Sequence, residues 1–241
     1  MSTSYTGILK GTPYFNGVGL GNTSKVTYSV ETEDKDLPDF ENPGGGLDDS
    51  FSRVKASKLQ FAFRRISIKS LELAFGGTAQ AVAAGAVADE AHTTGALDEL
   101  VGLDHVQDMA PALTVKNSAG TVTYDEGTDY VRKRAGIIPL TGGAITAAQD
   151  IKISYTKAKH VVVQGLVNLT REGKVTFDGI NERNSAAFLG DFHRVKMSPA
   201  KNVEFIGDDY ISFDCEGTLL KDDTITDPSK SQYYQVKVGS L

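Results

Sequence analysis

The alternation of apolar and polar residues is longest over Lys55–Phe75, which reads KASKLQFAFRRISIKSLELAF. Neighbouring side chains of a strand point to opposite faces, so Phe61 and Phe63 are expected to share one face. The apolar phase then moves to Ile66 and Ile68, which should face a different environment from the two phenylalanines. We predict one strand of roughly twenty residues with register shifts, although strands usually have about five or six residues. Such a strand is expected to leave its own core and to pack on another copy of the protein.

Shorter alternating runs, separated by glycine-rich turns, continue over most of the chain. The expected strands or groups of strands are Tyr5–Leu9, Lys25–Glu33, Leu113–Tyr155, His160–Thr170, Lys174–Ile180, Phe192–Leu220 with about three strands, and Ser231–Val238. The chain has 25 glycines, and glycine between short alternations favours turns between strands over helices. We therefore predict a mainly β fold with little helix, arranged as a β-sandwich or partly closed barrel.

The composition changes at residue 78, where an alanine-rich stretch without a clear period begins. Further on, LTVKNSAGTVTY has a hairpin pattern with its turn at Asn117–Gly120. The segment IKISYT then alternates cleanly. We predict a discontinuous main β domain, residues 1–77 and 158–241, and an inserted small β module, residues 78–157.

The segment Asp34–Ser52, DKDLPDFENPGGGLDDSFS, is rich in acidic residues and contains two prolines and three consecutive glycines. No regular element fits this composition, so we predict a long loop with at most one helical turn. Compact domains rarely carry such loops without a functional reason. Two interpretations stay open: a solvated flexible surface, or a contact arm that becomes ordered on assembly.

Composition offers little support for catalysis. The 241 residues carry a formal net charge of −6, which disfavours a protein that grips nucleic acid through its phosphates. The single cysteine, Cys215, lies in an apolar alternating run and is expected to be a small buried hydrophobe. The four histidines lack metal-ligand spacing, and the pairs of adjacent aspartates lie in predicted turns. We therefore predict a protein that is not an enzyme, with no catalytic residues, no metal and no cofactor.

The N-terminus lacks the basic and long apolar regions of a signal peptide, and no apolar run approaches eighteen residues. We expect a chain that is made and folded in a cytoplasm and has no membrane partner.

The C-terminal run DFHRVKMSPAKNVEFIGDDYISFDCEGTLLKD resembles the major tail tube protein of long flexible-tailed (siphovirus-type) bacteriophages. In that family a strand leads into SPA, here Ser198–Ala200, and then into I-G-D-D, here Ile206–Asp209. The next strand ends in G-x-L-L, here Gly217–Leu220. The segments Leu169–Asn184 and YTGILKGTPYF are also similar to the family.

The resemblance implies a structural virion protein whose hexameric rings stack into a hollow tail tube. Double-stranded DNA would pass through the tube into the host without tight binding. The implied partners are further copies of the chain, a tape measure protein and tail terminator or distal tail proteins. The implied location is the virion tail, after assembly in the host bacterial cytoplasm, with the inserted module on the tube exterior.

Two sets of contact residues follow as hypotheses from this resemblance. The acidic loop would reach the adjacent ring, and its candidate residues are Asp34, Asp36, Pro38, Phe40, Glu41, Asp48 and Asp49. The long strand would face a neighbouring subunit, and its candidate residues are Arg64, Arg65, Ile66, Ile68 and Lys69.

Other classes of protein stay open at this point. A distal tail protein of the same fold would cap a tube instead of repeating, and a secretion-system tube subunit is normally smaller. A module that binds a carbohydrate or receptor on a surface would need an aromatic-rich groove. The inserted module has few aromatic residues beyond Tyr124, Tyr130 and Tyr155.

Overall fold

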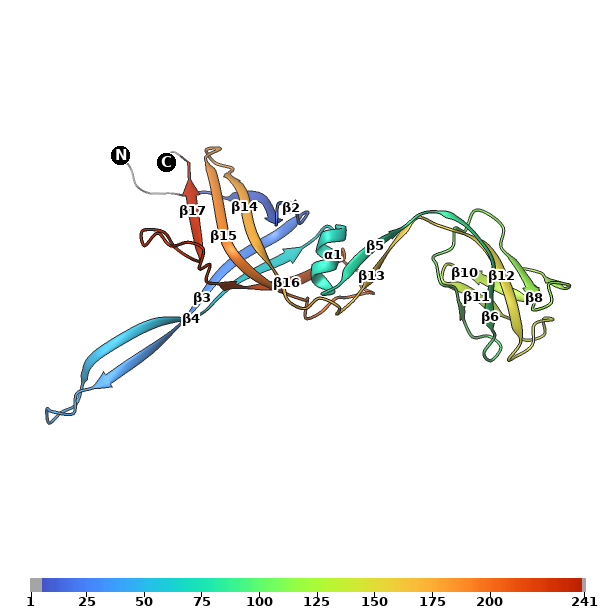
Figure 1. Ribbon diagram of the computed structural model, residues 1–241, viewed down its shortest axis with the longest axis horizontal. Helices are drawn as coiled ribbons and strands as arrows, with labels where there is room; N and C mark the ends of the chain where they lie inside the picture. The colour runs from blue at the N-terminus through green and yellow to red at the C-terminus, as the bar shows by residue number, and fades with distance from the viewer. Residues whose placement is uncertain (1–5, 240–241) are drawn as a thin grey trace. The chain divides into compact units, whose positions relative to one another are not determined.

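The computed structural model describes residues 6–239 and divides the chain into two compact units (Figure 1). Unit 1 combines the two ends of the chain, up to Ala79 and from Val163, and unit 2 is Gln80–Val162. The divisions thus lie at 79/80 and 162/163, where we expected 77/78 and 157/158. The chain leaves unit 1 through β5 (Thr78–Val82) and returns to it through β13 (His160–Gln164). These two strands pair as a two-stranded sheet.

Unit 1 is built on one eight-stranded antiparallel sheet of order β2-β1-β14-β15-β16-β4-β3, with β17 paired to β15. Its strands are β1 (Leu9–Phe15), β2 (Val18–Gly19), β3 (Thr23–Pro38), β4 (Leu47–Phe63), β14 (Arg171–Asn181), β15 (Ala187–Ser198), β16 (Phe213–Leu220) and β17 (Tyr234–Val238). The first half of β15 pairs with β17 and its second half with β16. The fold is mainly β and sandwich-like, and no sheet among residues 6–239 closes into a barrel.

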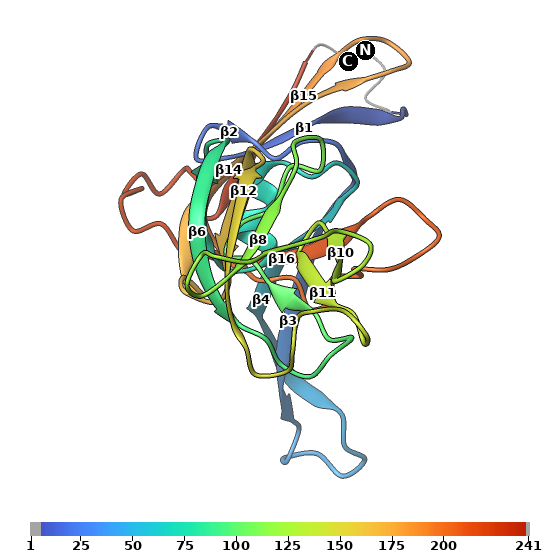
Figure 2. The same cartoon turned by 90° about the vertical axis from the view of Figure 1, so that its right-hand side faces the viewer.

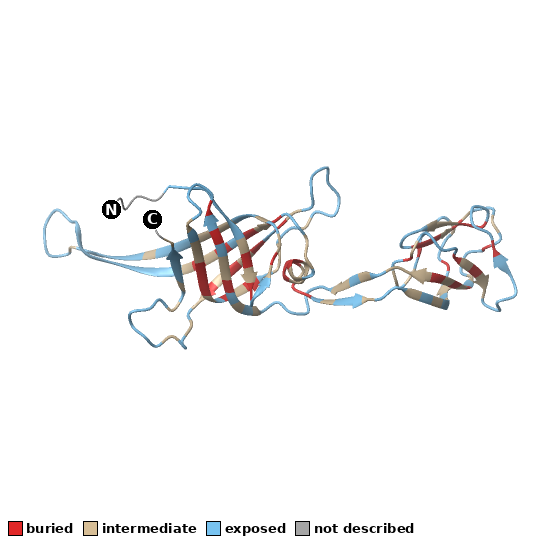
Figure 3. Cartoon of the chain, turned by 90° about the horizontal axis from the view of Figure 1, so that it is seen from above, coloured by how far each residue is buried: buried red, intermediate tan, exposed pale blue. Residues whose placement is uncertain are grey.

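The core of unit 1 is formed by alternate residues of its central strands (Figure 3). Leu59, Phe61 and Phe63 of β4 are fully buried, and the two phenylalanine rings stack with centroids 6.0 Å apart. Cys215 of β16 is buried in the same core, and burial raises the pKa of its thiol to about 12. It is therefore packed as a small apolar residue, as expected from the sequence.

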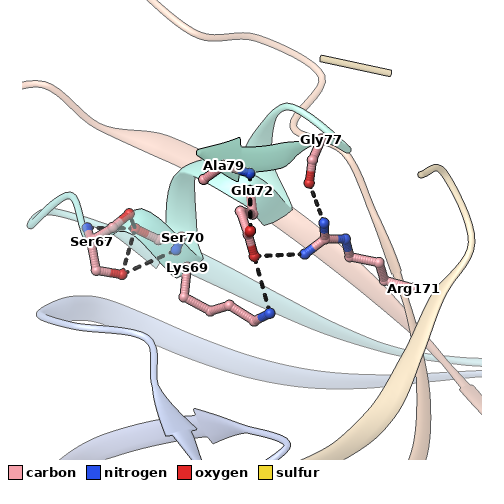
Figure 4. Close-up of polar contacts among 7 residues, drawn as sticks. All are labelled: Ser67, Lys69, Ser70, Glu72, Gly77, Ala79 and Arg171. Atoms are coloured by element: carbon pink, nitrogen blue, oxygen red, sulfur yellow. Dashed lines mark hydrogen bonds and ion pairs between the residues drawn. The ribbon is translucent and has the colours of Figure 1, made fainter. Parts of the chain in front are cut away.

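The prediction of one strand over Lys55–Phe75 is wrong. The strand β4 ends at Phe63, and α1 (Ile68–Ala74) follows (Figure 4). Ser67 caps the helix: its Oγ accepts from the Ser70 N–H at 3.0 Å, and its own N–H donates to the Ser70 Oγ at 2.8 Å. The last apolar residues of the segment therefore follow a helical period, in which Ser70, Leu73 and Ala74 are buried.

The change of apolar phase after Phe63 does mark a change in burial, although the residues do not lie on two faces of one strand. Phe61 and Phe63 are buried in the core, whereas Ile68 is half exposed on the helix. Ile66 is partly buried and packs against the same core as the phenylalanines. The expected contrast thus holds for Ile68 and not for Ile66.

Glu72 anchors the helix to the sheet (Figure 4). Its carboxylate accepts from Arg171 of β14 at 3.0 Å, from Lys69 at 3.1 Å and from the backbone N–H of Ala79 at 3.1 Å. Arg171 also donates to the Gly77 carbonyl. Burial acts to raise the pKa of Glu72, but these hydrogen bonds outweigh it and hold the pKa at about 2.

This ion pair predicts a component of acid sensitivity. Because the pKa of Glu72 in the folded state is lower than its ordinary value of 4.5, the stabilisation by its carboxylate is present at higher pH and is lost on acidification. Between pH 5 and pH 3 the loss should be about 2 kcal/mol in the free energy of unfolding. Urea unfolding of Glu72→Gln should lack this component, whereas the exposed control Glu182→Gln should keep it. An identical pH dependence in wild type and Glu72→Gln would contradict the assignment.

Unit 2 packs two small antiparallel sheets, of order β6-β12-β8-β9 and β10-β11-β7 (Figure 2). Its strands are β6 (Gly85–Thr93), β7 (Val101–Gly102), β8 (Thr114–Asn117), β9 (Thr123–Tyr124), β10 (Tyr130–Lys133), β11 (Gly136–Pro139) and β12 (Asp150–Lys157). Ile151 and Ile153 of β12 are buried with Val115 and Ile137, which confirms the alternation read from IKISYT. The expected hairpin is confirmed as β8–β9, and the alanine-rich stretch contributes β6.

Several smaller expectations have mixed outcomes. The tail strand is confirmed as β17. We expected about three strands in Phe192–Leu220, but the segment contains only the end of β15 and the whole of β16. Residues 199–212 between them form a loop with one isolated bridge, Val203 to Phe213. The first strand begins at Leu9, and Tyr5 lies outside the described residues. Within residues 6–239, no helix has the length and apolar character needed to cross a membrane.

Candidate assembly surface

The acidic segment is not the loop that its composition suggests. Strands β3 and β4 continue beyond the sheet as a two-stranded ribbon, and their ladder pairs Glu33 with Arg53 and extends to Pro38 and Leu47 (Figure 1). Only residues 39–46 lie outside the two strands. We refer to residues 30–54 as the arm. The prediction of a long loop over Asp34–Ser52 is therefore wrong, because most of this segment is a β-hairpin.

Polar side chains that face each other across the arm hold its register. Ser52 donates to Asp34 at 2.6 Å, and Ser50 donates to Asp36 at 2.7 Å. Arg53 forms an ion pair with Glu33 at 2.8 Å. Hydrogen bonds from Lys35 and then Arg53 lower the pKa of Glu33, so its carboxylate stays ionised. Serine–aspartate pairs thus take the place of the apolar cross-strand pairs of a buried sheet.

The tip of the arm is an ordered turn. The Asp39 carboxylate accepts from the backbone N–H groups of Glu41 and Asn42 at 2.8 Å and 3.1 Å, and from the Asn42 side chain at 2.7 Å. These hydrogen bonds lower the pKa of Asp39. The glycines Gly44–Gly46 have φ values of 135°, 70° and 143°, which L-residues rarely adopt. The sequence PGGG therefore closes a defined turn.

The arm exposes many large apolar side chains without a core of its own (Figure 3). Phe40 is 83% exposed and Phe51 is 63% exposed. The other exposed apolar residues of the arm are Val30, Leu37, Leu47 and Val54. An isolated two-stranded hairpin is at best marginally stable in water, and exposed apolar clusters commonly mark contact sites. The arm therefore has the chemistry of a segment that is covered by another molecule.

The net charge of the protein is concentrated on this arm. Its eight acidic and two basic residues account for the whole formal charge of −6, so acidic and basic residues balance over the rest of the chain. The hypothesised contact residues Asp34, Asp36, Asp48 and Asp49 belong to this set. The sequence shows the acidic cluster, but it does not show that a ladder displays it on an extended ribbon.

A second exposed apolar segment lies in the loop between β15 and β16. Ile206 is 95% exposed, and Phe205 and Tyr210 are also highly exposed. The Phe205 ring lies 6.2 Å from that of Phe75, at the end of α1. This loop carries the I-G-D-D motif, and its exposure was not expected from the sequence.

The second set of predicted contact residues does not lie on a strand. Arg64 and Arg65 are exposed in the turn after β4, where their backbone N–H groups donate to the Asn22 carbonyl at 2.9 Å and 3.2 Å. Ile68 and Lys69 lie on α1, and Lys69 forms an ion pair with Glu72. The designation of these residues as an inter-subunit strand is therefore wrong. An interface role for the exposed Arg64, Arg65 and Ile68 stays a prediction.

Titratable residues also gather in unit 2. Glu90 accepts from the Tyr155 hydroxyl at 2.7 Å and lies 2.6 Å from the His92 Nε2. Burial raises the pKa of Tyr155, and the hydrogen bond to Glu90 adds to this. Glu90 lies on β6 and Tyr155 on β12, and these strands are paired, so this hydrogen bond joins β6 to β12. Among residues 6–239 no group of three His, Cys, Asp or Glu side chains is arranged to hold a metal ion.

A family model described as "Protein of unknown function UCP028589" matches residues 15–237. The match spans both units and includes the arm and the loop between β15 and β16. No curated protein matches the sequence.

Proposed function

The chain belongs to the family described as "Protein of unknown function UCP028589", and we propose that it is a structural subunit that assembles with copies of itself. In the specific form of the proposal, it is a phage tail tube protein whose stacked hexameric rings form a hollow tube for DNA. The resemblance of residues 191–222 to such proteins supports this form. The arm is the observation that carries the proposal.

The arm supports assembly because its surface is unsuited to an isolated monomer. Six exposed apolar side chains lie on a ribbon with no core, and the ribbon is nonetheless fixed in register by cross-strand polar pairs. Preorganised segments lose less conformational entropy on binding than flexible ones. A ribbon of this kind is suited to docking on a neighbour.

Open sheet edges give a second line of support. In unit 1, β2 and β3 terminate the order of the eight-stranded sheet. Unpaired edges invite pairing with other chains, and association into a ring would cover them. Contacts between unlike surfaces of identical subunits give closed rings or open filaments, which is the geometry that a stacked tube requires.

The charge distribution is compatible with passage of DNA. The arm carries the excess negative charge, and the rest of the chain is balanced. Negative potential repels DNA phosphates, so a genome would slide past such subunits without tight binding. The proposed protein is not an enzyme. Its proposed partners are further copies, a tape measure protein and terminator or distal tail proteins, in the virion tail.

A carbohydrate- or receptor-binding role for unit 2 has less support. The tyrosines Tyr124, Tyr130 and Tyr155 are its only Phe, Tyr or Trp residues, and all three are buried. Sugar rings usually stack on exposed aromatic side chains, and unit 2 offers none. We propose that unit 2 lies on the exterior of the assembly.

Negative-stain imaging of the purified full-length chain over a range of concentrations tests the proposal. The expected result is rings and tubes of uniform diameter, whose mass per ring corresponds to six chains. Isolated rings that never stack would favour a distal tail protein. Monomers at every concentration, confirmed by sedimentation velocity, would overturn the proposal.

A further inference from the structure

Unit 1 contains an open groove of about 840 Å³ that is distinct from the arm. Residues of β1, β3, β4, β14, β15 and β17 line it. Its aromatic cluster is formed by Tyr28, Phe192 and Tyr234, whose ring centroids lie 4.8 to 6.0 Å apart. These mutual contacts fix the rings, so the groove presents a rigid apolar surface.

The rim of the groove is basic. Lys10 of β1 and Lys25 of β3 line it, and no aspartate or glutamate among residues 6–239 does. Both lysines are exposed, and neither forms an ion pair with another of the described residues 6–239. Exposed apolar residues, including Leu9 and Val236, continue the apolar surface towards the rim. The groove therefore fits a partner that is both apolar and acidic.

The tip of the arm has this combination. Phe40 and Leu47 are exposed and lie between the acidic residues Asp39, Glu41 and Asp48. Large aromatic side chains that enter apolar pockets are the usual anchors of protein interfaces, and complementary charge around them guides docking.

A tip cannot enter the groove of its own chain. Tyr28 lies in the groove, and β3 advances about 33 Å from Tyr28 to Pro38 at about 3.3 Å per residue. The paired ribbon also runs away from the body of unit 1 (Figure 1). An arm tip that enters this groove must therefore come from another copy.

We propose that the arm tip of one copy docks in the groove of a second copy, with Phe40 on the aromatic cluster and the acidic residues against Lys10 and Lys25. This inference rests on the proposed self-assembly and names its contact. Arm and groove are different surfaces, so each copy donates one arm and accepts another. Contacts of this type propagate from copy to copy.

Two complementary variants of the full chain test the contact. In the truncated-arm variant, an Asn-Gly turn replaces Pro38–Asp49 and leaves the groove intact. The rim variant is Lys10→Glu/Lys25→Glu and keeps the arm. Each variant alone should associate at least about tenfold more weakly than wild type. Mixed together, they should form a one-to-one dimer, measured by sedimentation velocity, because the arm of the rim variant enters the intact groove.

A matched control combines both changes in one chain, and this double variant should not bind the truncated-arm variant. Charge exchange gives a second test: adding Asp48→Lys/Asp49→Lys to the rim variant should restore self-association. Normal assembly of the rim variant would overturn the contact. Absence of the mixed dimer would also overturn it.

The outcomes separate this inference from the proposed function. A mixed dimer, together with a wild type that forms no tubes, would support the contact and reject the tube. Tubes of wild type without a mixed dimer would support the tube and reject this contact.

Discussion

Replacement of Pro38–Asp49 by an Asn-Gly turn is expected to abolish tube formation and to leave a folded monomer. The change removes Phe40 and Leu47, two of the most exposed apolar residues, and no residue of the unit 1 core. Leu37 and the inserted Asn-Gly form a three-residue loop that closes on the pair Asp36–Ser50, whose side-chain hydrogen bond remains. Loss of aromatic anchors commonly weakens an interface by 2 kcal/mol or more, so association should fall about thirtyfold or further.

Imaging and sedimentation velocity at matched concentrations measure this effect. A variant with Phe40→Ser and Leu47→Ser keeps the length and charge of the arm, so it separates apolar contact from reach. It should also fail to form tubes. Thermal unfolding should show both variants folded as in wild type. Tubes of normal appearance from the truncated chain would show that the arm is not an assembly element.

Most strands were predictable, because their burial alternates with the period of two. The segments that became β14 and the β8–β9 hairpin each have one apolar face that is buried in the folded protein. The predicted organisation as a main β domain with an inserted β module rested on the change in composition at residue 78.

The helix α1 was missed because its signal is local and brief. In ISIKSLELAF, residues 66–75, nearly every second residue is apolar, which fits a strand as well as a short helix. The deciding contact is the reciprocal pair of hydrogen bonds between Ser67 and Ser70, and serine at the third helical position is less specific than glutamate. The salt bridge of Glu72 to Arg171 then fixes the helix, and it joins residues far apart in sequence.

The hairpin of the arm was not predicted because its composition is typical of a loop. Aspartate, asparagine, glycine and proline are depleted in strands, so the composition of the segment favours a loop. The ladder forms because the side chains of Asp34 and Asp36 find serine partners directly across the hairpin. Pairing of this kind depends on register, which composition does not contain. The groove likewise combines residues of six strands, so its basic rim was not visible in the sequence.

A pair of phenylalanines in β4 should separate stability from assembly. Phe61→Ala is expected to lower the free energy of unfolding of unit 1 by about 3–5 kcal/mol, because Phe61 is 1% exposed and its loss leaves a cavity in the core. Phe51→Ala, on the same strand but 63% exposed, should change it by less than about 0.5 kcal/mol. Denaturant unfolding in the truncated-arm background measures both values, since that background keeps both residues and should not assemble.

In the full-length chain, tube formation should be weakened more by Phe51→Ala than by Phe61→Ala, at concentrations where both variants are folded. Phe51→Ala removes an apolar side chain from the arm and should raise the concentration needed for tubes, whereas its folded monomer should match wild type. A strand whose inner half stabilises the subunit and whose outer half contacts a neighbour accounts for both results. If Phe51→Ala lowered stability as much as Phe61→Ala, the arm would be packed within its own chain, and the division of β4 into these two roles would be wrong.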